Sequence, residues 1–400
     1  MKYLLLGLGI SNKSIKNYFD ENNIEYLVYD DNSCNVEIDF NEVSLIIKSP
    51  GIENTHPFLN KGIKVVTDLE MFYLLTENRN FITVTGANGK TTTVSLINHL
   101  IDDMDLAGNI GYPLFDFMYS KNDVIIEASS FMLEYIDKFR SKYNIILNLY
   151  KTHLEHHHTY ANYVKSKLNL LKNIKKDDYL IYNYDDVLLR RLVEVYDCIK
   201  IPISIKHQVG LHIKDNKIIY DGKVIETINN IKLLGNHNLI NVLCAIAVIM
   251  NYRGDLKRLS LFSGVKYRLQ YVGMIGNVRV FNDSKSTNYN ALSSAIKSFN
   301  NNILLICGGM KREDSLKSLE NLEKLKRVYC YGSNRFEFEE FFKANNIEVY
   351  SFETLDELIN NLDYKNIDVL LFSPGSVSYD QFDNYIYRGE VFNKLISKYF

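Results

Sequence analysis

The chain contains 400 residues, 46% of them hydrophobic, so it can form about two or three domains with sizeable cores. Its 46 basic and 48 acidic residues nearly balance, which argues against a general nucleic-acid or membrane surface. The five cysteines are scattered without a C-x-x-C pair, which argues against a disulfide framework or a cysteine zinc site. No apolar run approaches the roughly 20 residues of a membrane span, and the opening "KYLLLGLG" is too short for a signal peptide. We therefore expect a cytoplasmic protein.

The first segment, residues 1–78, has a Rossmann-like β-α-β pattern. An apolar strand ends in Gly7-Leu8-Gly9, a helical stretch follows, and a second strand ends in Asp30-Asp31. An acid about 20 residues past the glycines is typical of a nucleotide site. Asn12 stands where the G-x-G-x-x-G fingerprint has its third glycine, so the pattern is incomplete. NAD, another nucleotide-like ligand and a simple tight turn all remain open from this pattern alone.

The stretch "FITVTGANGKTTTVSLI", residues 81–97, predicts a strand, a phosphate-binding loop and a helix. Backbone N–H groups and a helix N-terminus would surround a polyphosphate, and Lys90 would add a positive charge. Val84 stands where the common P-loop has its first glycine, so this loop is a shortened form. The alternative interpretation, without a bound ligand, is a glycine-rich turn with a surface lysine. We expect ATP to bind the loop residues, which are Gly86, Ala87, Asn88, Gly89, Lys90, Thr91 and Thr92.

Two further features of the central segment, residues 79–264, carry candidate chemistry. Glu127 ends the strand "VIIE", where a Mg²⁺ ligand or a catalytic base is expected, although such an acid can simply be an exposed strand end. The run "HLEHHH" starts at His153 and has no cysteine partner, no H-E-x-x-H and no clear third ligand, so we expect no structural zinc site. Two interpretations of the run remain open. One of its histidines could reach a metal ion beside the phosphates, or the run could be a solvated loop.

The third segment, residues 265–400, alternates strands and helices again. The loops at 282–288 and 373–382 follow strands and are dense in polar groups, which is typical of binding loops, although capped turns look similar. Arg268 precedes them, in position to approach a γ-phosphate. The sequence thus predicts an α/β protein of three domains: a Rossmann-like domain (1–78), a P-loop domain with an added β-meander at 210–234 (79–264), and a second Rossmann-like domain (265–400).

Nine motifs occur in one order along the chain: "TGANGKTT", "GNIGYP", "IEASSFMLE", "ILNLYKTHLEHH", "NYDD", "LLGNHNLINVLCA", "FSGVKYRLQ", "NDSKSTN" and "SPGSVSYDQF". In these motifs the chain resembles the Mur ligases, ATP-dependent amide ligases of peptidoglycan precursor synthesis whose phosphate loop has the shortened form. The resemblance implies that a substrate carboxylate takes the γ-phosphate of ATP and that an amine then displaces phosphate from the acyl phosphate. Within the family, "SPGI" (49–52), "DLEMF" (68–72) and the C-terminal motif favour D-glutamate as the amine and UDP-N-acetylmuramoyl-L-alanine as the carboxylate.

The resemblance also assigns residue roles, and it implies small-molecule partners only and a monomer. It makes Lys90, Glu127, His153 and Lys167 catalytic, with Thr91, Glu127, His153 and Lys167 holding two Mg²⁺ ions. A carbamate on Lys167 would turn this amine into an oxygen ligand, with Lys165 as a nearby alternative. Besides the loop, ATP would contact Asn238, Asn241, Arg268 and Asp283. The UDP substrate would contact Gly9, Ser11, Asp30, Asp31, Asn32, Asn109 and Ser129, and D-glutamate would contact Lys285, Thr287, Lys311, Ser378 and Tyr385.

Several positions depart from the family's usual residues. Met132 replaces a glutamine, Thr152 an acid, Tyr267 a histidine and Tyr385 a phenylalanine. None of these changes removes Lys90, so we expect an active enzyme. Two alternatives remain: a ligase of the same superfamily that uses L-alanine, a diamino acid or a folate substrate, and a nucleotide-dependent switch that hydrolyses ATP without a carboxylate acceptor.

Overall fold

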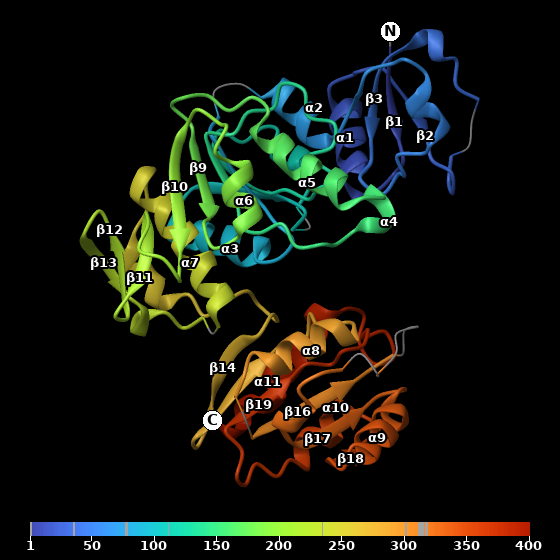
Figure 1. Cartoon of the computed structure of the whole chain (residues 1–400). Coiled ribbons are helices and arrows are strands. Elements are labelled where there is room, and N and C mark those ends of the chain that lie inside the picture. Colours follow the sequence, from blue (N-terminus) through green and yellow to red (C-terminus); the bar gives the residue numbers. More distant parts are fainter. Residues whose placement is uncertain are drawn as a thin grey trace. The chain divides into compact units, whose positions relative to one another are not determined.

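The computed structural model describes residues 2–34, 37–76, 79–110, 112–233, 235–300, 302–310, 316 and 319–400. It contains two compact units, the first formed by Met1–Ile231 and Asn236–Phe262 and the second by Lys232–Gly235 and Ser263–Phe400. Three separate β-sheets are present, two of them in the first unit (Figure 1). The expected boundary at residue 78 lies outside the described residues. The three-domain division therefore stays a prediction.

The first sheet is fully parallel, as the β-α-β pattern predicts, and its strand order is β2-β1-β3-β4. Leu5 packs on the α1 side of the sheet, while Leu4 and Leu6 pack in a separate core cluster. Burial on both faces explains why the first strand is continuously apolar instead of alternating. The elements are β1 (Lys2–Leu6), α1 (Ile10–Glu21), β2 (Tyr26–Tyr29), β3 (Val43–Lys48), β4 (Val65–Val66) and α2 (Asp68–Leu75).

Asn12, the residue that interrupts the glycine fingerprint, has a structural role. Its side chain is fully buried, and its Nδ2 donates hydrogen bonds to the carbonyl oxygens of Leu6 (3.2 Å), Gly7 (2.8 Å) and Ile47 (3.1 Å). The amide therefore ties the carboxyl ends of β1 and β3 together, which a glycine could not do.

Replacing Asn12 with alanine should lower the free energy of unfolding by about 1–3 kcal/mol, because buried carbonyl groups lose their donor. Lys13→Ala is the matched control, since Lys13 is the next residue of α1 and is exposed. The measurement is the midpoint of urea unfolding for both variants. Equal midpoints for the two variants would show that the Asn12 amide contributes nothing.

The second sheet has the strand order β13-β12-β11-β10-β9-β8-β5-β7-β6. Every pair from β11 to β6 is parallel, whereas β11, β12 and β13 form the expected antiparallel meander. Its hairpins turn at Asp215-Asn216 (φ 49° and 59°) and Asp221-Gly222 (φ 47° and 72°), the left-handed pairs that two-residue hairpins favour. The strands are β5 (Phe81–Thr85), β6 (Met104–Gly108), β7 (Asp123–Glu127), β8 (Tyr143–Ile146), β9 (Tyr179–Asn183), β10 (Ile199–Ser204), β11 (Leu211–Lys214), β12 (Lys217–Tyr220) and β13 (Lys223–Thr227).

The helices of this part of the first unit are α3 (Lys90–Leu100), α4 (Leu154–His157), α5 (Tyr160–Leu168), α6 (Val187–Leu192) and α7 (Asn236–Asn251). In the described part of the chain, no helix combines the length and the apolar character needed to span a membrane.

The second unit is built on a six-stranded sheet of order β14-β15-β19-β16-β17-β18, in which only the β14–β15 pair is antiparallel. One face carries a core with Leu292 of α8 and Phe338 of α9, and the other a core with Leu358 of α10 and Phe392 of α11. Helices on both faces confirm the expected α/β class. The elements are β14 (Gln270–Ile275), β15 (Val278–Asn282), α8 (Tyr289–Lys297), β16 (Ile303–Gly308), β17 (Leu325–Tyr331), α9 (Arg335–Ala344), β18 (Glu348–Ser351), α10 (Leu355–Asn360), β19 (Val369–Phe372) and α11 (Tyr385–Ile396).

Candidate active site

The candidate site lies where three neighbouring parallel strands of the second sheet end. Val84 of β5 pairs with Glu127 of β7, and Thr85 pairs with Ile146 of β8, so the three carboxyl ends lie at one edge. Such an edge, where strand order reverses, is where open α/β sheets bind ligands. The predicted phosphate loop leaves β5 at this point and leads into α3.

The loop has the backbone that its glycines predict. Gly89 caps α3 with a left-handed φ of 90° and provides no side-chain cap. A Cβ atom at this position would lie 2.4 Å from Oδ1 of Asn241, so α7 packs directly against the loop. Because no side chain caps α3, the first N–H groups of the helix can bind the oxygens of a phosphate.

Asn148, which follows β8, holds the loop in place. Its Oδ1 accepts a hydrogen bond from the Asn88 amide (2.9 Å), and its Nδ2 donates to the Asn88 carbonyl (3.0 Å). Its own carbonyl accepts from the Ala87 amide at 3.2 Å. Sequence reasoning missed this residue, although a polar side chain directly after the strand "NIIL" was the available signal.

Two lysines lie against the loop. Lys90 Nζ donates to the carbonyl oxygens of Gly86 (2.9 Å) and Ala87 (3.2 Å). Lys167 Nζ donates to the same Gly86 oxygen (3.0 Å) and to Thr85 Oγ1 (3.2 Å). Burial and then the charge of Lys90 hold the pKa of Lys167 well below its usual range, with Glu127 opposing them. Both effects act in favour of the neutral amine at Lys167.

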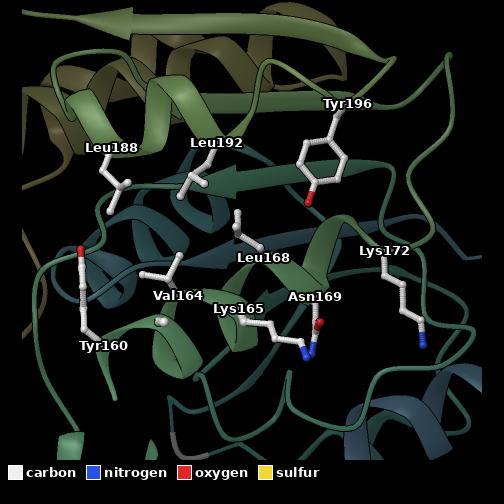
Figure 2. A pocket seen from close by; sticks show the side chains of 10 residues that line it. Tyr160, Val164, Lys165, Leu168, Asn169, Lys172, Leu188, Leu192 and Tyr196 are labelled. Atoms are coloured by element: carbon white, nitrogen blue, oxygen red, sulfur yellow. The ribbon is translucent and has the colours of Figure 1, made fainter.

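Lys165, the alternative to Lys167, lies elsewhere. It lines a pocket of about 640 Å³ between α5 and α6, where Figure 2 shows it beside Asn169 and across from Leu188 and Leu192. The structure thus places Lys167, and not Lys165, next to the phosphate loop.

Glu127 is suited to a metal ion. The residue is 2% exposed, and its Oε1 accepts a hydrogen bond from Asn109 Nδ2 at 3.0 Å. Its Oε2 is buried and has no hydrogen-bond partner among the described residues. Since Mg²⁺ prefers oxygen ligands and Thr91 lies in the first turn of the adjacent α3, this carboxylate and this hydroxyl fit a Mg²⁺ ion beside bound phosphates.

The position of His153 is less favourable for binding a metal ion. Its side chain is 46% exposed, and its Nδ1 lies 3.5 Å from Oε1 of Glu155. Among the described residues the possible three-ligand metal group is formed instead by Glu134, His156 and His157. Glu134 could not be found from the histidine run itself, because it lies 22 residues before His156 in the chain.

In the second unit, several predicted residues lie together. Asp283 is buried, which raises its pKa to about 7, and it accepts hydrogen bonds from the Leu269 amide (3.0 Å) and from Ser373 Oγ (2.8 Å). Lys285 Nζ lies 5.8 Å from the ring centre of Tyr385. The predicted residue Lys311 lies outside the described residues.

Comparison with known proteins identifies the family. The Mur ligase middle domain matches residues 84–249. The UDP-N-acetylmuramoylalanine–D-glutamate ligase of Hydrogenobaculum sp. is 33% identical over 420 aligned positions, which cover 100% of both chains. The enzyme of the same name from Oceanobacillus iheyensis is 33% identical over 377 positions, covering 88% of this chain and 83% of its own. The chain belongs to the Mur ligase family.

Solved Mur ligases share the fold of this one. The alanine ligase MurC of Thermotoga maritima has a TM-score of 0.59 at 17% identity, covering 100% of this chain and 99% of its own. The MurF ligase of the same organism, in complex with ADP, has a TM-score of 0.55 at 14% identity, covering 99% and 94%. At these identities the likeness concerns the fold.

The segments that follow β1 and β2 in this Mur ligase carry five of the residues predicted to bind a UDP substrate. Asp30 Oδ2 accepts a hydrogen bond from the Leu8 amide (2.7 Å), and this contact, followed by that of Ser33 Oγ, lowers the pKa of Asp30. Asp31 and Asn32 are exposed, and Gly9 lies close to the side chain of Ser49. Asp30 thus shapes its own loop, while its two neighbours are accessible to a ligand.

Met132, which replaces a usual polar residue of Mur ligases, belongs to the core. It is 3% exposed, and its amide donates a hydrogen bond to Ser129 Oγ at 3.2 Å. The departure therefore adds apolar packing near Ser129.

Arg388 of α11 is a residue of this Mur ligase that sequence reasoning missed. It is fully buried and joins the two polar loops of the second unit. Its Nε and Nη2 donate to Oγ (3.0 Å) and O (2.7 Å) of Ser284, and its Nη1 donates to the Ser376 carbonyl at 2.8 Å. One guanidinium therefore fixes both loops relative to each other.

Proposed function

We propose that this protein is an ATP-dependent ligase that adds D-glutamate to UDP-N-acetylmuramoyl-L-alanine, a cytoplasmic step of peptidoglycan precursor synthesis. The observation that carries the proposal is the full-length similarity to the Hydrogenobaculum ligase of that name. The phosphate loop, flanked by Lys90, Lys167 and the orphan carboxylate oxygen of Glu127, supplies the chemistry that such a reaction needs.

The reaction joins a carboxylate to an amine through an acyl phosphate. A substrate carboxylate oxygen forms a bond to the γ-phosphorus of ATP while the bond to the β-γ bridging oxygen breaks, which releases ADP. The D-glutamate nitrogen then attacks the acyl carbon, phosphate leaves, and the nitrogen loses a proton to give the amide. Because two anions must meet in the first step, charge neutralisation is the main task of the site. Lys90 and the loop N–H groups provide it on the protein side.

Two Mg²⁺ ions would add to this neutralisation, since divalent cations offset the negative charge of transferring phosphates. We assign one ion to Thr91 and Glu127 and the other to His153 and Lys167, with Lys167 as a carbamate. The carbamate forms when the neutral amine bonds to CO₂ and releases a proton, and the lowered pKa of Lys167 favours this neutral amine. Asn238, Asn241, Arg268 and Asp283 are assigned to the nucleotide.

The organic substrates are assigned to the outer segments of the chain. The uridine and sugar part of the first substrate is assigned to residues 1–78 and to two residues of the central segment, the full set being Gly9, Ser11, Asp30, Asp31, Asn32, Asn109 and Ser129. D-glutamate is assigned to residues 265–400, with Lys285, Thr287, Lys311, Ser378 and Tyr385 as its contacts. Lysines and hydroxyl groups suit a dicarboxylate. We propose that the protein acts as a monomer.

Arg388→Met should raise the KM for D-glutamate about 10- to 100-fold, because the loops that carry Lys285 and Ser378 lose their common anchor. The KM for ATP should rise less, because Asp283 is the single assigned ATP contact on these two loops. Arg279→Met, on the exposed side of β15, is the matched control, and Arg388→Lys should recover part of the affinity. A lower kcat with unchanged KM values for all substrates would indicate general misfolding. That result would contradict a role of Arg388 in positioning the loops.

ADP formation by the purified protein tests the proposed function. Mg²⁺, ATP, UDP-N-acetylmuramoyl-L-alanine and D-glutamate are supplied together and then omitted one at a time. We expect turnover only when all four are present. ATP hydrolysis that does not require UDP-N-acetylmuramoyl-L-alanine would favour the nucleotide-dependent switch. Turnover with L-alanine or a diamino acid would favour another ligase of the superfamily.

A further inference from the structure

Two of the histidines that follow His153, namely His156 and His157, form a compact cluster with Glu134. His156 Nε2 lies 3.0 Å from Oε1 and 3.1 Å from Oε2 of Glu134. His157 Nδ1 lies 3.1 Å from the same Oε1. The three side chains are nearly or fully buried, with exposed fractions of 9%, 11% and 2% for Glu134, His156 and His157.

These donors match a known type of metal site. Two imidazole nitrogens and one carboxylate oxygen are the protein ligands of open, tetrahedral Zn²⁺ sites. The three ligand atoms lie within 4.8 Å of one another. In a tetrahedral site with bonds of about 2.0–2.1 Å the ligand atoms stand slightly more than 3 Å apart, so the two glutamate–histidine contacts already have suitable lengths.

The surroundings fix the orientation of both rings. His157 Nε2 lies 2.9 Å from Ser130 Oγ, which leaves Nδ1 directed at Glu134. Phe131 stacks on the His157 ring at 5.5 Å and meets the His156 ring edge-on at 4.5 Å. Such outer contacts orient the ligands of a metal ion.

Two further groups face the cluster from the first sheet. Asn54 Nδ2 donates to Glu134 Oε1 at 2.9 Å, as an outer partner of the carboxylate would. Lys48 Nζ is buried, lies 3.8 Å from Glu134 Oε2 and has no hydrogen-bond partner among the described residues. A protonated Lys48 would compete with a cation for the Glu134 carboxylate.

We propose that Glu134, His156 and His157 form a binding site for a divalent transition-metal ion of the Zn²⁺ type. One Zn²⁺ ion replaces the protons that the two imidazoles share with Glu134, and a water molecule completes the coordination. The ion fastens α4, a four-residue helix, to the segment after β7. The site uses none of the residues assigned above to Mg²⁺, and it does not depend on the proposed ligase activity.

The test is calorimetric titration of the full-length, tag-free, chelator-treated protein with Zn²⁺ in the absence of nucleotide. We expect one Zn²⁺ per chain, and Co²⁺ bound to the same protein should give the visible absorption of a four-coordinate ion. His156→Asn should weaken binding by at least about tenfold and remove this absorption, because a direct ligand is lost. His158→Asn is the matched control, since His158 is exposed on the same segment.

Lys48→Met adds a test with the opposite sign, because removal of the competing ammonium should tighten Zn²⁺ binding. This gain of affinity cannot arise from a loss of folding. Circular dichroism of each variant checks that the fold is retained. Wild-type stoichiometry in His156→Asn, or weaker binding in Lys48→Met, would overturn the proposal and assign the bound metal to other histidines.

Discussion

Lys90→Ala is expected to lower the rate of ADP formation about 100- to 1,000-fold, because one preorganised positive charge at the transferring phosphate is lost. Lys90 sits at the N-terminus of α3 with its Nζ folded over the loop, 2.9 Å from the Gly86 carbonyl. An ammonium group on this short tether can move from the loop carbonyls to a bound phosphate without any change in the backbone. The measurement is the steady-state rate of ADP release at saturating substrates.

Lys165→Ala is the matched control for this experiment. Lys165 is an exposed lysine of α5 that lines a different pocket, so its loss should leave the rate unchanged. A Lys90→Ala enzyme with nearly full activity would contradict the assignment of residues 86–92 as the ATP loop. Equal losses in both variants would point to a general effect of surface charge.

Lys167→Ala is expected to reduce activity by a similar factor, for a different reason. If Lys167 acts as a carbamate, its loss removes an oxygen ligand of Mg²⁺ and leaves space in the site. A small carboxylate such as formate or acetate, added at high concentration, should then restore part of the rate. The same anions should not rescue Lys90→Ala, because a carboxylate cannot replace a cation.

The pH and CO₂ dependence of the wild-type enzyme gives a second measure of this claim. Because the pKa of Lys167 lies well below its usual range, Lys167 has a larger share of the neutral amine that reacts with CO₂ than an ordinary lysine has. As pH falls, the amine binds a proton and carbamate formation is suppressed, so CO₂-free buffer should lower activity more at acidic than at alkaline pH. No effect of CO₂ removal at any pH, together with no rescue of Lys167→Ala, would mean that Lys167 works as an unmodified amine.

Local patterns in the sequence were sufficient to predict the elements of the site. A strand, a glycine loop and a helix are contiguous in residues 81–97, and Glu127 ends a strand whose apolar run is easily read. These features depend on short-range backbone geometry, so one segment contains all the information. The Asp-Asn and Asp-Gly turns of the meander were predictable for the same reason.

The residues that sequence reasoning missed act over long separations in the chain. Asn148 contacts Asn88 from 60 residues away, and Arg388 contacts Ser284 from 104 residues away. Glu134 and His156 are 22 residues apart on different elements. Each of these side chains is ordinary in its own segment and gains its role only from the tertiary fold. Asn12 shows the same limit, because its three acceptors lie at the carboxyl ends of two different strands.

Product analysis is the most direct test of the proposed ligase. The protein is incubated with ATP, Mg²⁺, UDP-N-acetylmuramoyl-L-alanine and either D-glutamate or L-glutamate, and the products are identified by mass spectrometry. The account predicts a product heavier by one glutamyl residue with D-glutamate and none with L-glutamate. A product from another amino acid, or ADP without any amide product, would contradict it.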